Sequence, residues 1–259
     1  MKIKNYIRIF YLFIFFQKLI SAATSNPEYG QNGMVVSTSN QASEAGIEIL
    51  KKGGNAIDAA VAVGFALAVT SSSNGNIGGG GFLVASFANG RSITLDHREK
   101  APLNAHPNMF LNDSGSVIPG MSLYSRASSG VPGTVDGLIR ALEDHGSGKI
   151  SLREVLNPAI KLAERGFILS YFEANRLNVY KKFFERNKAA SKIFIRSDGK
   201  PWKKGQKFIQ KDLAKTLKKI ARYGRDGFYS GTVAQLIVQE MKRGNGLITK
   251  EDLHNYESK

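Results

Sequence analysis

Cysteine is absent from the 259-residue sequence. Disulfide bonds, thiolate metal sites and cysteine nucleophiles are therefore excluded. Histidine is scarce, and no two histidines have the spacing typical of metal ligands. We expect each of the four to be a surface or loop residue: His97, His106, His145 and His254. The sequence predicts no metal site and no cofactor.

Acidic residues are also few, because 21 Asp and Glu stand against 36 Lys and Arg, and the net charge is +15. Sixteen of the basic residues lie between Tyr180 and Arg225, together with three acids. A strip of this kind can attract nucleic acid or an anionic membrane surface. A solvated helical face, or a surface neutralised by an acidic partner subunit, is the simpler interpretation, since no stacking pattern of aromatic residues accompanies the charge. We therefore expect no nucleic-acid partner.

Two strongly apolar runs are both shorter than the ~20 residues that a bilayer-spanning helix needs. The first, Ile9–Phe16, follows three basic residues and precedes the small residues Ser21–Ala23, an order typical of a secretory signal peptide. We expect residues 1–23 to be a signal peptide cleaved after Ala23, so that the protein is periplasmic or secreted and has no stable membrane anchor. A buried N-terminal helix is the weaker alternative. Cleavage would remove four of the positive charges and leave +11 of the original +15.

The second run, Ala56–Thr70, is apolar on every face and is expected to be a helix buried within the protein. Residues 24–259 contain no Pro- or Gly-rich linker that would separate independent domains. Hydrophobic periodicity and capping residues predict a helix-covered β layer followed by a helical region. The expected strands are Gly33–Thr38, Phe82–Phe87 and Ser92–Asp96. The expected helices are Asn40–Lys52, Ala56–Thr70, Thr134–His145, one from the cap Ser151 to Gly166, Tyr171–Asn187, Lys211–Tyr223, Thr232–Arg243 and a last one capped by Thr249.

A glycine-rich stretch, Ser73–Phe82 (SNGNIGGGGF), lies between the apolar helix and the first strand of a predicted hairpin. No Gly-Lys-Ser/Thr follows it, and it comes after a helix and before a strand, so it fits neither a Walker loop nor a dinucleotide fingerprint. Close backbone packing of the glycines against the apolar helix is the better interpretation. The hairpin turns at Asn89-Gly90, and its second strand delivers Arg98-Glu99 to the strand end.

Residue chemistry alone identifies little else. No Gly-x-Ser-x-Gly nucleophile elbow occurs, and Arg98-Glu99 by itself is most simply a surface ion pair worth ~0–1 kcal/mol.

Seven motifs read together change this interpretation. In chain order they are GNAIDAAVA (54–62), GNIGGGGF (75–82), DHREKAP (96–102), GVPGTV (130–135), LNPAIKLA (156–163), GFYSGTVA (227–234) and GLITKEDL (246–253). Each is weak alone, but in this order they closely resemble the γ-glutamyltranspeptidases, from about Gly33 to the last residue.

The resemblance implies an α+β protein with the N-terminal-nucleophile fold, an αββα sandwich that is incomplete in this chain. It implies a proenzyme that cuts itself into a large and a small subunit. The N-terminal threonine of the small subunit attacks the γ-glutamyl amide of glutathione, and its own α-amine acts as the base. The acyl group then passes to water, an amino acid or a peptide. In that family the arginine of the Arg-Glu motif, here Arg98, holds the α-carboxylate of the donor.

No Thr-Thr pair occurs in the chain, and no threonine matches the nucleophile motif. We therefore expect residues 24–259 to be the N-terminal part of the large subunit, truncated and inactive alone, with no catalytic residue in this chain. Its expected partners are the missing C-terminal part and small subunit, together with glutathione and other γ-glutamyl compounds. The alternative is a non-catalytic exported module that binds an anionic surface through its basic strip.

Overall fold

The computed structural model of the protein describes residues 27–71 and 73–259. The chain divides into two units, residues 1–34 and residues 35–259. In the first unit, the described residues 27–34 form no helix or strand and are exposed. The predicted signal peptide, residues 1–23, lies outside the described residues. Everything below concerns the second unit.

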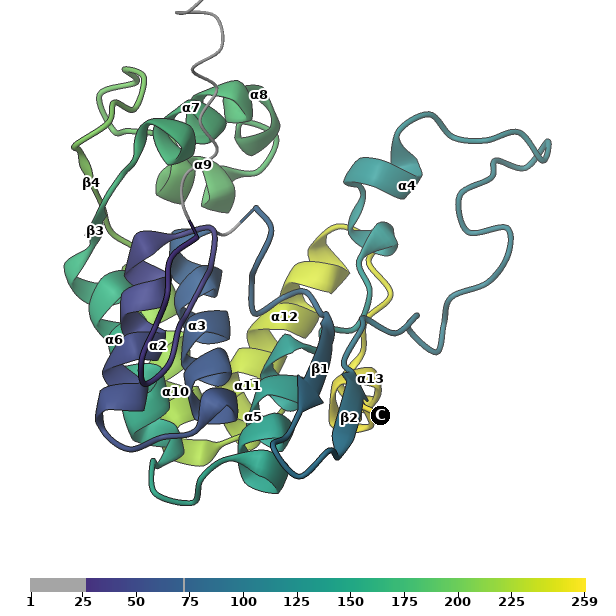
Figure 1. Ribbon diagram of the computed structural model, residues 1–259. Coiled ribbons are helices and arrows are strands. Elements are labelled where there is room, and N and C mark those ends of the chain that lie inside the picture. Colours follow the sequence, from purple (N-terminus) through teal and green to yellow (C-terminus); the bar gives the residue numbers. More distant parts are fainter. Residues whose placement is uncertain (1–26, 72) are drawn as a thin grey trace, which may run out of the picture. The chain divides into compact units, whose positions relative to one another are not determined.

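The elements of the second unit follow one another as a helical pair, a hairpin, and then a long helical region (Figure 1). In chain order they are α2 (Asn40–Lys51), α3 (Ala56–Thr70), β1 (Phe82–Ser86), β2 (Ser92–Asp96), α4 (Met121–Tyr124), the 3₁₀ turn η1 (Arg126–Ser128), α5 (Thr134–His145), α6 (Leu152–Arg165), β3 (Phe167–Ile168), α7 (Tyr171–Val179), α8 (Lys181–Phe184), α9 (Lys188–Phe194), β4 (Lys207–Phe208), α10 (Lys211–Tyr223), α11 (Asp226–Tyr229), α12 (Gly231–Arg243) and α13 (Lys250–His254).

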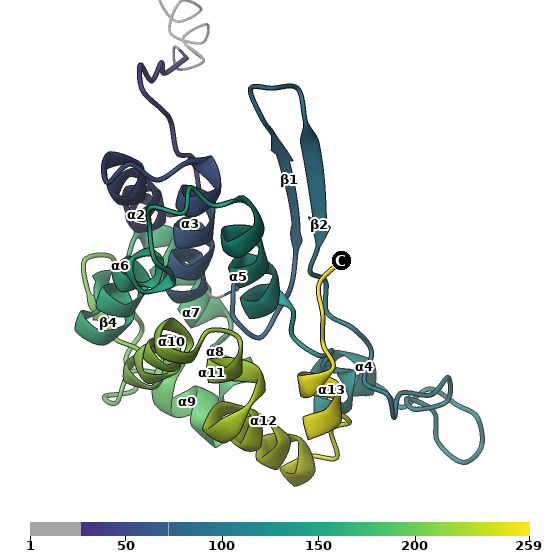
Figure 2. The same ribbon diagram turned by 90° about the horizontal axis from the view of Figure 1, so that it is seen from below.

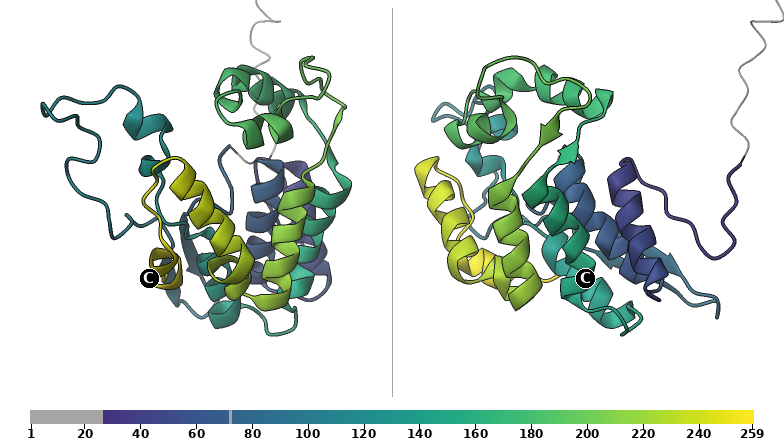
Figure 3. Two further views of the ribbon diagram at one scale, coloured as in Figure 1. Left: turned by 180° about the vertical axis from the view of Figure 1, so that it is seen from behind. Right: turned by 90° about the vertical axis from the view of Figure 1, so that its left-hand side faces the viewer.

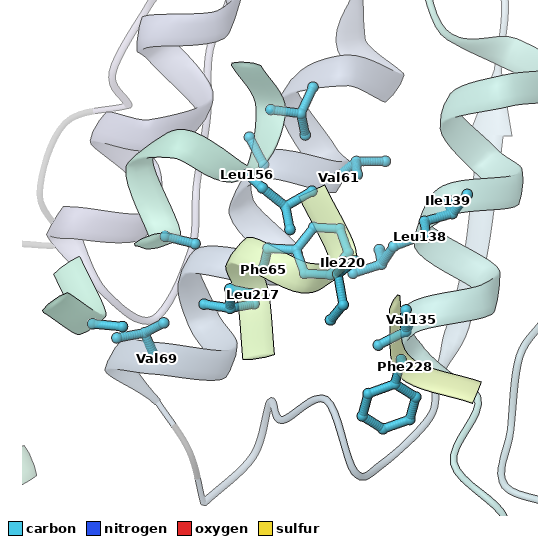
Figure 4. Packing of buried hydrophobic residues seen from close by; sticks show 14 of the residues in the cluster. Val61, Phe65, Val69, Val135, Leu138, Ile139, Leu156, Leu217, Ile220 and Phe228 are labelled. Atoms are coloured by element: carbon cyan, nitrogen blue, oxygen red, sulfur yellow. The ribbon is translucent and has the colours of Figure 1, made fainter. Parts of the chain in front are cut away.

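Helix α3 is the centre of the hydrophobic core, as its apolar sequence predicts. It begins at a capping box, in which the Asn55 side chain accepts from the amides of Ile57 and Asp58 while the Asp58 carboxylate accepts from the Asn55 amide. Its side chains Val61, Phe65 and Val69 pack toward residues of α5, α6, α10 and α11 (Figure 4). Because helices cover α3 on several sides, an all-round apolar sequence is the one that such a position requires.

The β1–β2 hairpin lies beside α5 (Figure 2). Its strands pair antiparallel in the register Phe82↔Asp96 to Ser86↔Ser92. Leu83 and Leu95 face the helices, while Phe82 and Val84 on the other face are 64% and 78% exposed. The turn contains Gly90 at φ +80°, a left-handed conformation that suits glycine.

The end of the chain continues this small sheet at the edge of β2 (Figure 2). The Asp96 amide donates to the Lys259 carbonyl (2.6 Å), and the Lys259 amide donates to the Asp96 carbonyl (2.8 Å). This reciprocal pair is the hydrogen-bonded pair of an antiparallel ladder. Residues 163 positions apart in the chain are thus adjacent, and the segment after α13 is brought to the end of β2.

The α+β class predicted from the sequence is confirmed, with helices and strands in one unit. The strands of the described residues form two separate two-stranded sheets, β1–β2 and β3–β4. A sandwich of two stacked sheets therefore stays a prediction.

Two of the predicted elements were wrong. Gly33–Thr38 forms no strand, and Val36 is 83% exposed, because no other described segment pairs with this backbone to satisfy its hydrogen bonds. The single predicted helix Tyr171–Asn187 is instead α7 and α8 with a break at Tyr180, and Asn187 caps a further helix, α9. These three short helices lie together at one end of the helical layer (Figure 3).

Most lysine side chains of the basic strip are exposed, as expected for a solvated face. Part of the charge is neutralised locally, since Arg196 pairs with Asp198 (2.6 Å) and Lys215 with Asp212 (2.9 Å). Residues 101–133 are largely loop, apart from α4, η1 and two isolated bridges.

Candidate functional site

Strand alternation decides where each residue of the Asp96–Glu99 segment points. In β2 the even-numbered residues Ser92, Thr94 and Asp96 are exposed, whereas Ile93 is half-buried and Leu95 is buried. The ladder continues beyond β2, because the amide of His97 donates to the carbonyl of Gly81 (3.0 Å) and the amide of Gly81 donates back (3.2 Å). His97 therefore belongs to the buried face and Arg98 to the exposed face.

The sequence predicts His97 to be a surface or loop residue; it lies in the irregular segment just beyond β2, but it is not on the surface. It is 7% exposed, and its imidazole lies against Gly81 and Gly137, where an added Cβ would crowd the ring. Burial lowers the pKa of His97 below its usual value of 6.5, although the nearby carboxylates of Asp96, Glu99 and Asp136 oppose this shift. Its Nδ1 atom has no hydrogen-bond partner among the described residues. The alternation of the strand was the sequence signal that could have identified this burial.

The other three histidines were also predicted to be surface or loop residues. His106 and His254 are exposed, whereas His145 at the end of α5 is half-buried.

The main chain around Arg98 is held on several sides. The Arg98 amide donates to Asp96 Oδ1 (2.9 Å), and Lys100 and Val131 exchange amide–carbonyl hydrogen bonds of 3.2 and 2.7 Å. The Arg98 carbonyl accepts a hydrogen bond from the hydroxyl of Tyr256 (2.8 Å). A rigid backbone therefore carries the Arg98 side chain.

The glycine-rich stretch supports this backbone. Gly80 lies so close to the main chain of residues 97–99 that an added Cβ would come under 3.0 Å from it. The Gly79 carbonyl accepts from the amides of Gly133 (2.8 Å) and Thr134 (3.0 Å), which are free at the start of α5. Contact with the apolar helix, which the sequence predicts, is made at Gly75, where a Cβ would be 3.2 Å from Leu67 Cβ. Most of the close packing is instead against the Arg-Glu segment.

The Arg98 side chain itself is 64% exposed. Its Nε lies 3.5 Å from Glu99 Oε2, and its guanidinium carbon lies 5.7 Å from the centre of the Phe82 ring. The ion pair is long and half-solvated, so it is weak. The planar guanidinium therefore retains N–H donors that can bind an incoming carboxylate through two parallel hydrogen bonds.

Sequence reasoning missed the residues that reach this segment from the C-terminal half. Tyr256 comes from the tail after α13, Tyr229 from α11 and Arg225 from the start of α11, while Asp136 comes from α5. The Asp136 carboxylate accepts from Arg225 Nε (2.7 Å) and from the Ser258 amide (2.8 Å). These residues are up to 158 positions away from Arg98, and no local pattern could have connected them to it.

The described residues contain no group of three or more metal-ligating side chains that could hold an ion.

No helix within residues 27–71 or 73–259 is both long and apolar enough to cross a membrane. A cavity of about 540 Å³ lies away from Arg98 and is lined by aromatic residues that include Phe167, Phe172 and Phe208.

Comparison with known proteins identifies the family to which the chain belongs. Residues 42–259 match the family described as gamma-glutamyltranspeptidase. The structure is similar to the crystal structure of Helicobacter pylori gamma-glutamyltranspeptidase, with a TM-score of 0.87 and 46% identity over 90% of this chain and 66% of that chain. The fold and site thus define a member of the gamma-glutamyltranspeptidase class.

Curated relatives agree with the structural comparison. The chain is 46% identical over 240 residues to a protein of Pseudomonas sp. (strain A14) named glutathione hydrolase proenzyme, covering 93% of this chain and 41% of that protein. It is also 46% identical over 233 residues to the protein of the same name from Escherichia coli (strain K12), covering 90% of this chain and 40% of that protein. The chain belongs to the γ-glutamyltranspeptidase family, and it spans about two fifths of the length of these relatives.

Proposed function

We propose that this chain is the N-terminal part of the large subunit of a γ-glutamyltranspeptidase, or glutathione hydrolase. The enzyme would cleave the γ-glutamyl bond of glutathione and related amides and pass the γ-glutamyl group to water, amino acids or peptides. The names of the relatives, glutathione hydrolase proenzyme, support this substrate class. Export after cleavage behind Ala23 is part of the same proposal.

The nucleophile is assigned to a small subunit outside this sequence. The 259 residues contain no adjacent threonine pair, and the family's nucleophile is an N-terminal threonine whose α-amine takes the hydroxyl proton. The threonine oxygen would bond to the γ-carbonyl carbon, and the carbon–nitrogen bond would break as the leaving amine receives the proton. The chain is therefore proposed to be inactive alone, and its own contribution is to bind the donor.

The observation that carries this proposal is the contrast between the backbone and the side chain of Arg98. The backbone amide and carbonyl are both hydrogen-bonded, by Asp96 and Tyr256, while the side chain is 64% exposed. A rigid mount whose guanidinium is largely exposed and only weakly paired with Glu99 is suited to orient a carboxylate, because little ordering of the backbone remains to be done when the ligand binds. We assign the α-carboxylate of the γ-glutamyl donor to this position.

The test is Arg98→Lys in enzyme assembled with its small subunit, assayed with two anilide donors. γ-Glutamyl p-nitroanilide carries the α-carboxylate, whereas 4-aminobutyryl p-nitroanilide lacks it. Lysine keeps the charge but cannot make two parallel hydrogen bonds, and one charged hydrogen bond is worth ~1.5–3 kcal/mol. We expect kcat/KM for the γ-glutamyl donor to fall about 10- to 100-fold, mainly through KM, and the loss to shrink for the second donor.

Arg91→Lys is the matched control, since Arg91 is an exposed arginine in the turn of the same hairpin. This variant should have the same kcat/KM as the parent enzyme for each of the two donors. A silent Arg98→Lys would mean that Arg98 is only a strand-end partner of Glu99. Equal losses with the two donors would point to a folding defect and would reject the carboxylate assignment.

A further inference from the structure

The Tyr256 ring reaches the Arg98 segment from the opposite end of the chain. Tyr256 follows α13, is 2% exposed, and donates its hydroxyl to the main-chain carbonyl of Arg98 at 2.8 Å. No other hydrogen bond to this carbonyl is found within residues 27–71 and 73–259. Among the described residues, the Tyr256 hydroxyl is thus the one hydrogen-bond donor that holds the carbonyl of the peptide between Arg98 and Glu99.

The ring is itself fixed by its neighbours. It stacks on the ring of Tyr229, with centroids 5.7 Å apart and planes 7° from parallel. The Tyr229 hydroxyl donates to the Pro132 carbonyl (2.7 Å) and accepts from the Asp136 amide (3.3 Å), which anchors the stack to the start of α5. Arg225 donates to the Tyr256 carbonyl. A hydroxyl on an anchored ring holds its acceptor in one place.

Cations cover both rings. The Lys100 ammonium lies 4.9 Å from the centre of the Tyr256 ring, and the Arg225 guanidinium carbon lies 4.6 Å from the centre of the Tyr229 ring. Lys100 Nζ also donates to the Glu257 carbonyl (2.5 Å). The tail after α13 is thus bound directly to the segment that contains Arg98.

Gly133 makes room for this hydroxyl. A Cβ at position 133 would lie well under 3.0 Å from both the Tyr256 hydroxyl oxygen and the His97 carbonyl oxygen. The backbone angles at Gly133, φ −118° and ψ −16°, are open to any residue, so conformation does not require glycine there. Space for the Tyr256 hydroxyl, and for the carbonyl beside it, is what the glycine provides.

We propose that Tyr256 is a positioning residue for donor binding: its hydroxyl fixes the Arg98–Glu99 peptide and so sets the direction of the Arg98 guanidinium. This inference rests on the proposed function of Arg98. Tyr256 does not contact the donor, and it acts only through the arginine.

The decisive variant is Tyr256→Phe, which removes the hydroxyl and keeps the ring stack. In the assembled enzyme we expect KM for γ-glutamyl p-nitroanilide to rise about 3- to 10-fold, the range for loss of one neutral hydrogen bond. kcat should stay within about twofold, and 4-aminobutyryl p-nitroanilide should be used as before. Tyr223→Phe, at an exposed tyrosine of α10, is the matched control and should leave KM and kcat unchanged for both donors.

A double variant separates this inference from the proposed function. If Tyr256 acts through Arg98, Tyr256→Phe should have no further effect on KM in the Arg98→Lys background. An unchanged KM for Tyr256→Phe, with Arg98→Lys still selective for the carboxylate donor, would overturn the role of Tyr256 alone. If Tyr256→Phe lowered kcat/KM equally for both donors, or lowered kcat with no change in KM, the positioning role would also be overturned and a merely structural role indicated. If Arg98→Lys itself shows no donor selectivity, the proposed function fails instead.

Discussion

Gly137 offers a test of how tightly the buried face of the Arg98 segment is packed. In the interior of an exposed helix, Gly→Ala stabilises by ~1 kcal/mol, because alanine has less backbone freedom to lose. Gly137 lies in α5, but a Cβ there would be well under 3.0 Å from Cβ and Cγ of His97. Carbon atoms pack best at ~3.5–4.0 Å, so this overlap cannot be absorbed by small adjustments.

The net effect of Gly137→Ala follows from these opposing terms. His97 cannot move away easily, since its backbone is paired with Gly81. Overpacking of a rigid site costs up to ~3 kcal/mol, and subtracting the ~1 kcal/mol gained in helix propensity leaves a destabilisation of about 2 kcal/mol. For a protein of this size, that corresponds to a fall in Tm of about 4–8 °C.

The assay is thermal unfolding followed by circular dichroism, with Gly64→Ala in α3 as the matched control. A Cβ at Gly64 would be 2.9 Å from Leu138 Cδ1, the end of a flexible side chain that can shift, so its Tm should change by no more than about 3 °C. In the background His97→Gly, Gly137→Ala should become harmless, because the overlapping atoms are gone. A Tm for Gly137→Ala that equals or exceeds that of the parent protein would refute the packing argument.

Two further predictions concern pH and export. The pKa of His97 is lowered in the folded state, so the unfolded chain binds more protons than the folded chain as pH falls below ~6.5. The stability of the folded protein should therefore fall as pH drops below ~6.5. The difference in Tm between pH 7.5 and pH 5.5 should be smaller in His97→Phe than in the parent protein, and an identical difference in both proteins would contradict the assignment. N-terminal sequencing of the exported protein should begin at Thr24, and an intact Met1 in a cytosolic fraction would reject the signal-peptide prediction.

The sequence by itself determined the local structure wherever a local physical signal is strong. The capping residues Asn55, Ser151 and Thr249 each begin the helix that they predict, and Asn89-Gly90 forms the turn of the hairpin. Capping and turn formation involve neighbours within about four residues, so sequence carries the full information. The order of seven motifs likewise determined the family.

Tertiary structure decided what depends on distant partners. Gly33–Thr38 has a strand-like sequence, but no described strand lies beside it. The helix expected at Tyr171–Asn187 breaks at Tyr180, and Asn187 caps the next helix, α9, instead of ending the first one. Sequence identified Arg98, but its expectation of a surface or loop position for His97 did not reveal that this side chain is buried.

Only the fold shows that Arg98 is held by Tyr256 and that the tail at Lys259 pairs with Asp96. The physical reason is that a hydrogen bond or a packing contact between residues more than a hundred positions apart leaves no periodicity in the chain. It exists only once helix burial has brought the two segments together.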